Sequence, residues 1–190
     1  MLEGRELHVH PDYVDVGSTT GFDLALVVLD GTVDDVDRPA TLYAGQDEAG
    51  KLLTFVGYGS RGIGSAGQQD RYYDGGGEKA GATGVIDYVQ DGASEDDSGD
   101  YLGVFLARED GAIDNPYGGE NTPHDRHAGL LGSGDSGGPA FLKIGKRWLL
   151  AGVNSNGSGT AQYGDSSWFV RLSARRDWIA EQAPVARFGQ

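Results

Sequence analysis

Gly134-Asp135-Ser136-Gly137-Gly138-Pro139 is the most informative segment of this sequence. A serine among such small residues can stand exposed while the backbone beside it approaches a substrate closely. Gly134 can adopt a conformation that turns its N–H toward a ligand, and Ser136 can present its own N–H beside it. Two converging N–H donors form an oxyanion hole, which stabilises the charge that develops in acyl transfer. On composition alone, the alternative is a glycine-rich turn between two strands.

Short apolar runs separated by turn residues surround this segment and predict an all-β domain. Some runs alternate with period two, and others are apolar throughout, as expected for strands in a core. The predicted strands are 23–29, 52–58, 84–89, 101–107, 139–144, 148–153 and 167–172. Gly145-Lys146 lies between two of them and predicts a hairpin turn. The 33 glycines among 190 residues favour many turns over long helices.

One helix is predicted, at the C-terminus. Ser173 belongs to a residue type that caps helices, and Pro184 should end the helix at about Ala183. Its apolar face would consist of Leu172, Ala174, Trp178 and Ile179. Residues 30–39 are polar and end in proline, which predicts a linker. Residues 75–79, 91–100 and 110–134 are predicted to be loops.

The composition excludes several classes of protein. The formal net charge of −14 argues against duplex nucleic acid or an anionic membrane surface as the main partner. The absence of cysteine excludes disulfides, thiolate zinc sites and a cysteine nucleophile. No run of 18 apolar residues is present, which excludes a transmembrane helix. The first eight residues carry charge where a signal peptide needs an apolar core, so no signal peptide is predicted.

The segment from Gly134 to Phe141, Gly-Asp-Ser-Gly-Gly-Pro-Ala-Phe, resembles the nucleophile segment of the trypsin/chymotrypsin-like serine proteases. Further stretches resemble other segments of that family in the family's order, most closely its bacterial, cysteine-free members. They are Val9-His10-Pro11-Asp12-Tyr13, Phe22-Asp23-Leu24-Ala25-Leu26, Phe55-Val56-Gly57-Tyr58-Gly59, residues 151–157 and Asp177-Trp178-Ile179. The resemblance extends over almost the whole chain.

The resemblance implies a role for each matched residue. Ser136 would be the nucleophile, and Asp23 would orient the catalytic histidine and stabilise its imidazolium. Gly134 and Ser136 would supply the oxyanion-hole N–H groups. Asp135 would stand where members activated by cleavage pair an aspartate with their new N-terminus. No cofactor is implied.

The same resemblance implies the substrate-binding residues. Ser155, Asn156 and Gly157 would pair with the backbone of a protein or peptide substrate as an antiparallel strand. Leu130, Leu131, Gly157 and Ser167 would line the pocket for the side chain before the scissile bond. Because Leu130 stands where trypsin-type members carry aspartate, an apolar or small side chain is expected there rather than Arg or Lys.

One part of the family pattern is missing. The family's catalytic histidine precedes the His-Pro-x-Tyr stretch by roughly thirty residues, and this chain has neither an Ala-Ala-His segment nor an Ile-Val-Gly-Gly start. An alcohol without a base is a weak nucleophile, and losing the histidine costs about 10⁶ in kcat in a protease of unrelated fold. The chain by itself is therefore expected to be nearly inactive. Either it is a piece of a longer protease, or it is a natural degenerate protein.

Other residues offer weaker alternatives. His8 and His10 lie on the wrong side of the aspartate segment to serve as the base. His124 and His127, with Asp125 between them, could act as a base or hold a metal, although a solvated loop is the plainer interpretation. Glu95-Asp96-Asp97 with Asp100 could bind Ca²⁺ or form a solvated acidic loop. No metal site is predicted.

The expected architecture is an all-β, trypsin-like double antiparallel β-barrel with the first barrel incomplete, plus a C-terminal α-helix. Residues 1–30 would be the remnant of the first barrel and 31–40 a linker. Residues 41–172 would form the second barrel, which carries the nucleophile, and 173–190 the helix and tail. The predicted function is a serine endopeptidase, extracellular or periplasmic by resemblance. The alternative is a catalytically inactive homologue that acts as a binding module.

Overall fold

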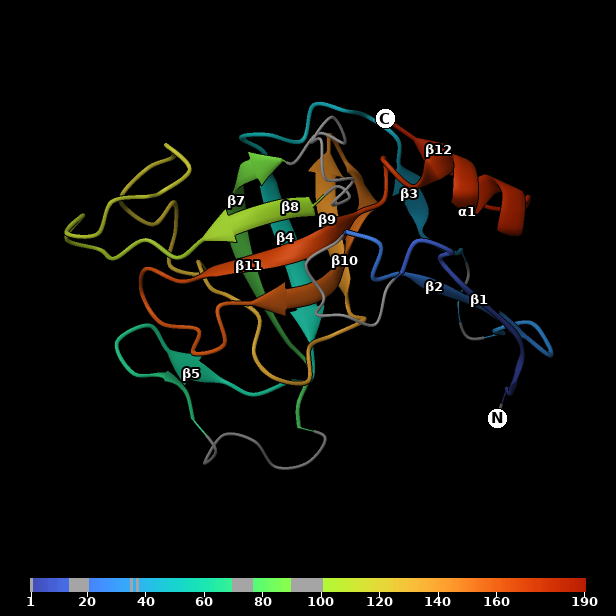
Figure 1. The fold of residues 1–190 in the computed structure, drawn as a ribbon, viewed down its shortest axis with the longest axis horizontal. Coiled ribbons are helices and arrows are strands. Elements are labelled where there is room, and N and C mark those ends of the chain that lie inside the picture. The colour runs from blue at the N-terminus through green and yellow to red at the C-terminus, as the bar shows by residue number, and fades with distance from the viewer. Residues whose placement is uncertain (1, 14–20, 35, 37, 70–76, 90–100) are drawn as a thin grey trace.

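The computed structural model describes all residues except 1, 14–20, 35, 37, 70–76 and 90–100. Its centre is a closed barrel of six antiparallel strands (Figure 1). In barrel order these are β4 (Leu52–Gly57), β7 (Ala80–Val89), β8 (Tyr101–Phe105), β11 (Ser166–Arg171), β10 (Arg147–Gly157) and β9 (Pro139–Ile144). The ring closes because β9 pairs with β4 as well as with β10. This architecture confirms the all-β prediction and is consistent with a trypsin-like fold.

The barrel closes around side chains that point inward from every strand. In β4, Leu53 and Phe55 are buried while Leu52 is exposed, which is the period-two pattern of a strand with one face in the core. Phe55 contacts Phe169 of β11 across the barrel, with ring centroids 5.0 Å apart. The other buried members of this core are Tyr43, Ile86, Leu102, Val104, Ala140, Leu142, Leu149 and Ala151.

Each of the seven predicted strands is present; β9 has the predicted ends, and the other six differ at one or both ends. The strand expected from Asp23 is β2 (Ala25–Leu29), and β10 runs on to Gly157. The predicted turn at Gly145-Lys146 joins β9 to β10, and Gly145 has a φ of 60°. The sequence did not reveal β1 (Gly4–Val9), β3 (Thr41–Tyr43), β5 (Gly62–Ile63), β6 (Gly67–Gln68) and β12 (Phe188–Gly189).

The C-terminal helix is shorter than predicted and is not capped by Ser173. Helix α1 (Arg176–Gln182) begins after Arg175, which makes no side-chain cap, and ends at Ala183 as expected. The Ser173 hydroxyl instead donates to buried Glu48 Oε1, at 2.5 Å. The capping prediction is therefore wrong, because a carboxylate 125 residues away takes the hydroxyl. Ile179 is the buried residue of the helix.

Strands β1 and β2 form a two-stranded antiparallel sheet of their own, which stands out from the barrel beside α1 (Figure 1). The connection predicted at 110–134 has no strand and touches the barrel at an isolated bridge between Thr83 and Ala128. The acidic run at 95–97 and Asp100, with the loop that holds it, lie outside the described residues. No helix in the described part of the chain has the length and apolar character that a membrane crossing requires.

Candidate functional site

The turn that carries Ser136 lies immediately before β9. Gly134 has a φ of 94° and Gly137 a φ of 78°, in the left-handed region that favours glycine. The Asp135 N–H donates to Gly132 O at 3.1 Å, and the Gly138 N–H donates to Asp135 O at 3.1 Å. These two bonds close a compact turn, and Ser136 is exposed at its tip.

The Asp135 side chain ties this turn to the segment that follows β4. Its Oδ1 accepts from the Gly59 N–H and its Oδ2 from the Gly132 N–H, each at 2.8 Å. A Cβ atom at Gly57 would lie 1.9 Å from Asp135 Oδ1, so the backbone there must be glycine for the carboxylate to fit. The resemblance implied a charged N-terminus as the partner of Asp135. In the structure the carboxylate accepts from two backbone amides.

Two N–H groups of the turn point to no acceptor. The Ser133 N–H donates to Gln68 Oε1 and the Gly137 N–H to Asn154 O, both at 2.8 Å. The amides of Gly132, Asp135 and Gly138 are also satisfied. Among the described residues, the N–H groups of Gly134 and Ser136 have no hydrogen-bond acceptor. They are the two groups assigned to an oxyanion hole from the sequence.

Asp23 lies just before β2. It is hydrogen-bonded to a residue of β10 at a point where the pairing of β10 with β11 is irregular. The pairing of β10 with β11 steps from Asn154 opposite Phe169 to Asn156 opposite Trp168, which leaves Ser155 as the extra residue of a β-bulge. Bulges commonly redirect one side chain toward a site. Here the Ser155 hydroxyl donates to Asp23 Oδ2 at 2.8 Å.

Consecutive residues of β10 therefore bring Asp23 and Ser136 to the same part of the molecule. Asn154 accepts the Gly137 N–H from the Ser136 turn, and Ser155 binds Asp23. Buried Tyr101 also hydrogen-bonds Ser155. Burial is the main cause that raises the Tyr101 pKa above its ordinary value, so this phenol stays neutral at physiological pH.

The residues assigned to the side-chain pocket separate into two groups. The Leu131 N–H donates to Ser167 Oγ at 3.0 Å, and Gly157 lies opposite Ser167 in the β10–β11 pairing. A Cβ atom on Gly157 would approach Ser167 Oγ to 3.2 Å, so the glycine keeps this strand open. Leu130 instead lines a cavity of about 390 Å³ behind the Ser136 turn, together with Asp135.

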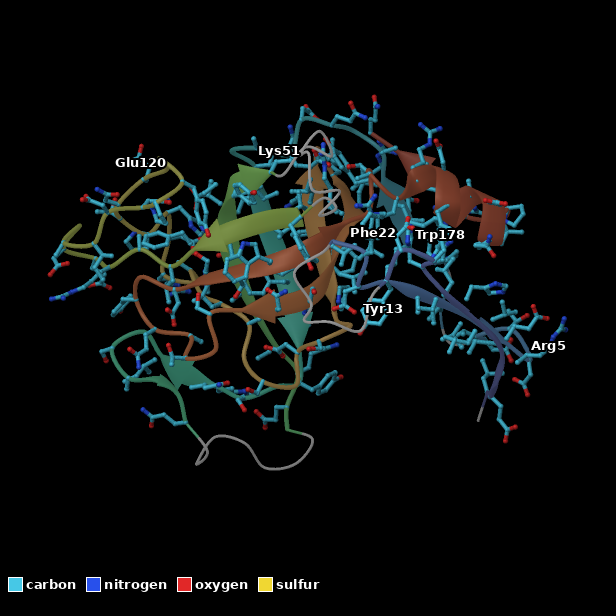
Figure 2. The ribbon with its side chains drawn as sticks, viewed as in Figure 1. Arg5, Tyr13, Phe22, Lys51, Glu120 and Trp178 are labelled. Atoms are coloured by element: carbon cyan, nitrogen blue, oxygen red, sulfur yellow. The ribbon has the colours of Figure 1, made fainter. Side chains whose placement is uncertain are left out.

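The four histidines make other contacts. His10 is 6% exposed and packs between Phe22 and Trp178, with ring centroids 4.9 and 4.8 Å away. Figure 2 shows Phe22 and Trp178 side by side where the β1–β2 sheet meets α1. In the part of the chain that the structure describes, no histidine hydrogen-bonds Asp23 or Ser136.

The side chains of the His124–His127 segment contact each other and the barrel. His124 Nε2 lies 3.0 Å from Thr83 Oγ1, and Asp125 Oδ1 accepts from the His127 N–H at 2.6 Å. No group of three or more histidine or acidic side chains that could hold a metal ion occurs within the described residues. The alternative of a metal bound at this segment has no support in the structure.

Two residues of the site were not foreseen from the sequence. Gln68 accepts the Ser133 N–H, and the side-chain amide of Asn154 donates to one carbonyl of the Ser136 turn and to one of β4. The sequence signal for Asn154 was a polar amide side chain directly after the largely apolar run of residues 148–153. Gln68 lies in the two-residue strand β6, where no periodicity could mark it.

Comparison with known proteins gives a match over part of the chain. A stretch of 51 residues, 27% of this chain, is 43% identical to a tryptase from Mus musculus, and it spans 19% of that protein. No family model matches the chain. The partial match and the closed β-barrel together suggest, at most, a trypsin-like serine protease.

Proposed function

We propose that this chain carries the nucleophile of a trypsin-like serine endopeptidase, with Ser136 as the attacking residue. The observation that carries the proposal is the pair of N–H groups at Gly134 and Ser136. They flank an exposed serine, and they find no acceptor among the described residues, although the neighbouring amides of the turn are all satisfied. Such a pair suits the oxyanion of a tetrahedral intermediate.

The proposed mechanism is acyl transfer followed by hydrolysis. Ser136 Oγ attacks the scissile carbonyl carbon as a histidine removes its proton, and the carbonyl oxygen becomes an oxyanion held by the N–H groups of Gly134 and Ser136. The histidine returns the proton to the leaving amine, and water then releases the acyl group. Asp23, held by Ser155, orients that histidine and stabilises its positive charge. Because no histidine hydrogen-bonds Asp23 within the described residues, the proposal requires a histidine supplied from outside this sequence.

The substrate would be an extended peptide. Ser155, Asn156 and Gly157 end β10 beside the nucleophile, where a peptide can pair with them as an added strand. Leu131, Gly157 and Ser167 lie together next to this strand, and Leu130 adds no charge. An apolar or small side chain before the scissile bond fits these residues. The resemblance to trypsin-like proteases favours an extracellular or periplasmic location.

The test is covalent labelling with a fluorophosphonate probe. The polypeptide encoded by the complete reading frame that contains this chain should be labelled at Ser136, and Ser136→Ala should abolish the labelling. Asp23→Asn should slow it by about 10⁴, the size of the effect in a serine protease with an intact triad. Ser133→Ala is the matched control, because it alters an exposed hydroxyl of the same turn. A folded polypeptide that has a histidine beside Asp23 and is not labelled contradicts the proposal.

A binding module is the second candidate. It is favoured by one observation, the lack of any contact between a histidine and Asp23 among the described residues. Such a protein would bind peptides along Ser155–Gly157 without cleaving them. A peptide that binds with equal affinity to the unaltered protein and to Ser136→Ala, and that stays intact, distinguishes this candidate from the enzyme.

A further inference from the structure

Asn154 lies beneath the Ser136 turn and has no part in the mechanism above. It is 2% exposed. Its side-chain Nδ2 donates to Asp135 O at 3.0 Å and to Val56 O at 3.2 Å. Its backbone N–H donates to Gly138 O at 2.9 Å, and its carbonyl accepts the Gly137 N–H at 2.8 Å. One buried residue thus makes three hydrogen bonds to the turn and one to β4.

The side-chain amide of Asn154 has one atom that lacks a hydrogen-bond partner. Its Oδ1 is buried and has no donor among the described residues. A buried acceptor without a donor destabilises a fold, and an apolar residue of the same size would avoid that cost. The opposite orientation of the amide would place Oδ1 against two carbonyl oxygens. The observed orientation is therefore the one in which the amide can donate to the carbonyls of Val56 and Asp135.

The Asp135 carbonyl belongs to the same peptide unit as the Ser136 N–H. In a planar trans peptide the C=O and the N–H point in opposite directions. When Asn154 Nδ2 and the Gly138 N–H hold Asp135 O on the inner side of the turn, the Ser136 N–H must point outward. A rotation of this peptide would instead present a carbonyl oxygen where the oxyanion has to bind.

We propose that Asn154 is a positioning residue, which fixes the Asp135–Ser136 peptide plane so that the Ser136 N–H faces the substrate carbonyl. The proposal rests on the function proposed above, because it assigns that N–H to the oxyanion. It concerns a residue that touches no reacting atom and acts through the Asp135 carbonyl.

Asn154→Leu is the first variant, because leucine has nearly the same shape but lacks the donor. Amide hydrogen exchange on ¹⁵N-labelled protein should show the protection of the Gly137 and Gly138 N–H groups falling about tenfold, the factor that one lost hydrogen bond produces. Asn115→Leu is the matched control. Asn115 is also buried, at 8% exposed, and also holds a loop, by accepting the Tyr117 N–H at 3.0 Å. It should leave both glycine amides unchanged.

Asn154→Asp separates positioning from packing. A protonated carboxyl can donate to a carbonyl, whereas a carboxylate can only accept. The protection factors of Gly137 and Gly138 in this variant should therefore be near the unaltered values at low pH and fall as the pH rises. Asn154→Leu should show no such pH profile, and it should also slow fluorophosphonate labelling of the complete polypeptide at least tenfold.

The outcomes are distinguishable. Unchanged glycine protection in folded Asn154→Leu, or a pH-independent Asn154→Asp, overturns the positioning role whatever the labelling shows. Altered protection with unchanged labelling also overturns it, because the turn would then not govern Ser136. If the unaltered polypeptide is not labelled at all, the proposed function fails, and the exchange data still decide whether Asn154 holds the peptide plane.

Discussion

At the scale of single residues, Ser136 is held in an exposed position because hydrogen bonds fix the residues on both sides of it. The Asp135 carboxylate accepts from two N–H groups and its carbonyl accepts from two more, and the Gly137 N–H donates to β10. Among the described residues, the N–H of the serine between them has no hydrogen-bond acceptor, so it is available to a ligand. The reactive geometry proposed here is thus a property of its neighbours.

A second feature at this scale is the buried histidine His10, which directly follows β1. Burial between Phe22 and Trp178 lowers the pKa of His10, the charge of Arg175 lowers it further, and Asp12 partly opposes both. Below the ordinary pKa of 6.5 the unfolded chain therefore binds this proton more readily than the folded chain. The stability that neutral His10 provides is complete above that pH and is lost as the pH falls through the lowered value.

His10→Asn should weaken the pH dependence of stability. Asparagine keeps an acceptor near the Asp12 N–H but cannot take up the proton. Between pH 7.5 and 5.5 the free energy of unfolding should fall less in this variant than in the unaltered protein, by at most about 1.4 kcal/mol per pH unit. Urea unfolding measures it, with His127→Asn as control because that side chain is 60% exposed. Equal slopes for His10→Asn and the unaltered protein would show that His10 is not the group involved.

At the scale of elements, a buried ion pair joins three segments that are far apart in the sequence. Glu48, in the connection between β3 and β4, is 0% exposed. Its Oε1 accepts from Arg171 Nε at 3.0 Å and its Oε2 from Arg171 Nη2 at 2.9 Å. Ser173, just before α1, adds its hydroxyl to the same carboxylate. This contact fixes the end of β11 and the start of the C-terminal segment.

Glu48→Gln should be among the most destabilising conservative substitutions in the chain. It removes the carboxylate that pairs with the buried Arg171 guanidinium, and breaking a buried ion pair costs about 3–5 kcal/mol in comparable cases. The urea midpoint should fall accordingly, with an unchanged slope. Glu181→Gln, at an exposed position of α1, should stay within about 0.5 kcal/mol of the unaltered protein. A loss for Glu48→Gln as small as that of the control would mean that the pair contributes little.

Local sequence patterns predicted the strands that contribute apolar side chains to the core. They did not predict the contacts between residues that are far apart in the sequence. β9 and its turn were predicted because Pro139–Ile144 is a short, largely apolar run and Gly145-Lys146 follows it. β1 was missed because it is mostly exposed and carries charged and polar residues beside its two apolar ones. The bond from Asn154 to Val56 joins residues 98 positions apart, and the one from Ser173 to Glu48 joins residues 125 apart. No window of sequence contains such pairs, so the motif identified Ser136 but not the residue beneath its turn.

At the scale of the whole molecule, the β1–β2 sheet exposes apolar side chains to solvent. Figure 2 shows Arg5 at its outer end, far from the barrel. Leu7 and Val27 are 64% and 56% exposed, and all five residues of β2 are apolar. In the described structure β2 pairs with β1 alone, which leaves its other edge open. An open, apolar edge strand promotes association with other strands.

The isolated chain should therefore self-associate, and Val27→Lys should reduce this association by placing a charge on the edge strand. Sedimentation velocity measures the change. Val185→Lys is the matched control, because Val185 is 90% exposed and lies outside β1 and β2. A soluble monomer with a sharp two-state melt, before any substitution, would contradict the prediction.

The measurement that tests the central claim most directly is a crystal structure of the complete polypeptide with a peptide boronic acid, a mimic of the tetrahedral intermediate. The account predicts a covalent bond from Ser136 Oγ to boron. It also predicts one boronate oxygen within about 2.7–3.1 Å of both the Gly134 and the Ser136 nitrogen atoms. The peptide part should pair with Ser155–Gly157. A boronate bound away from Ser136, or a turn whose two N–H groups face elsewhere in the complex, would contradict the claim.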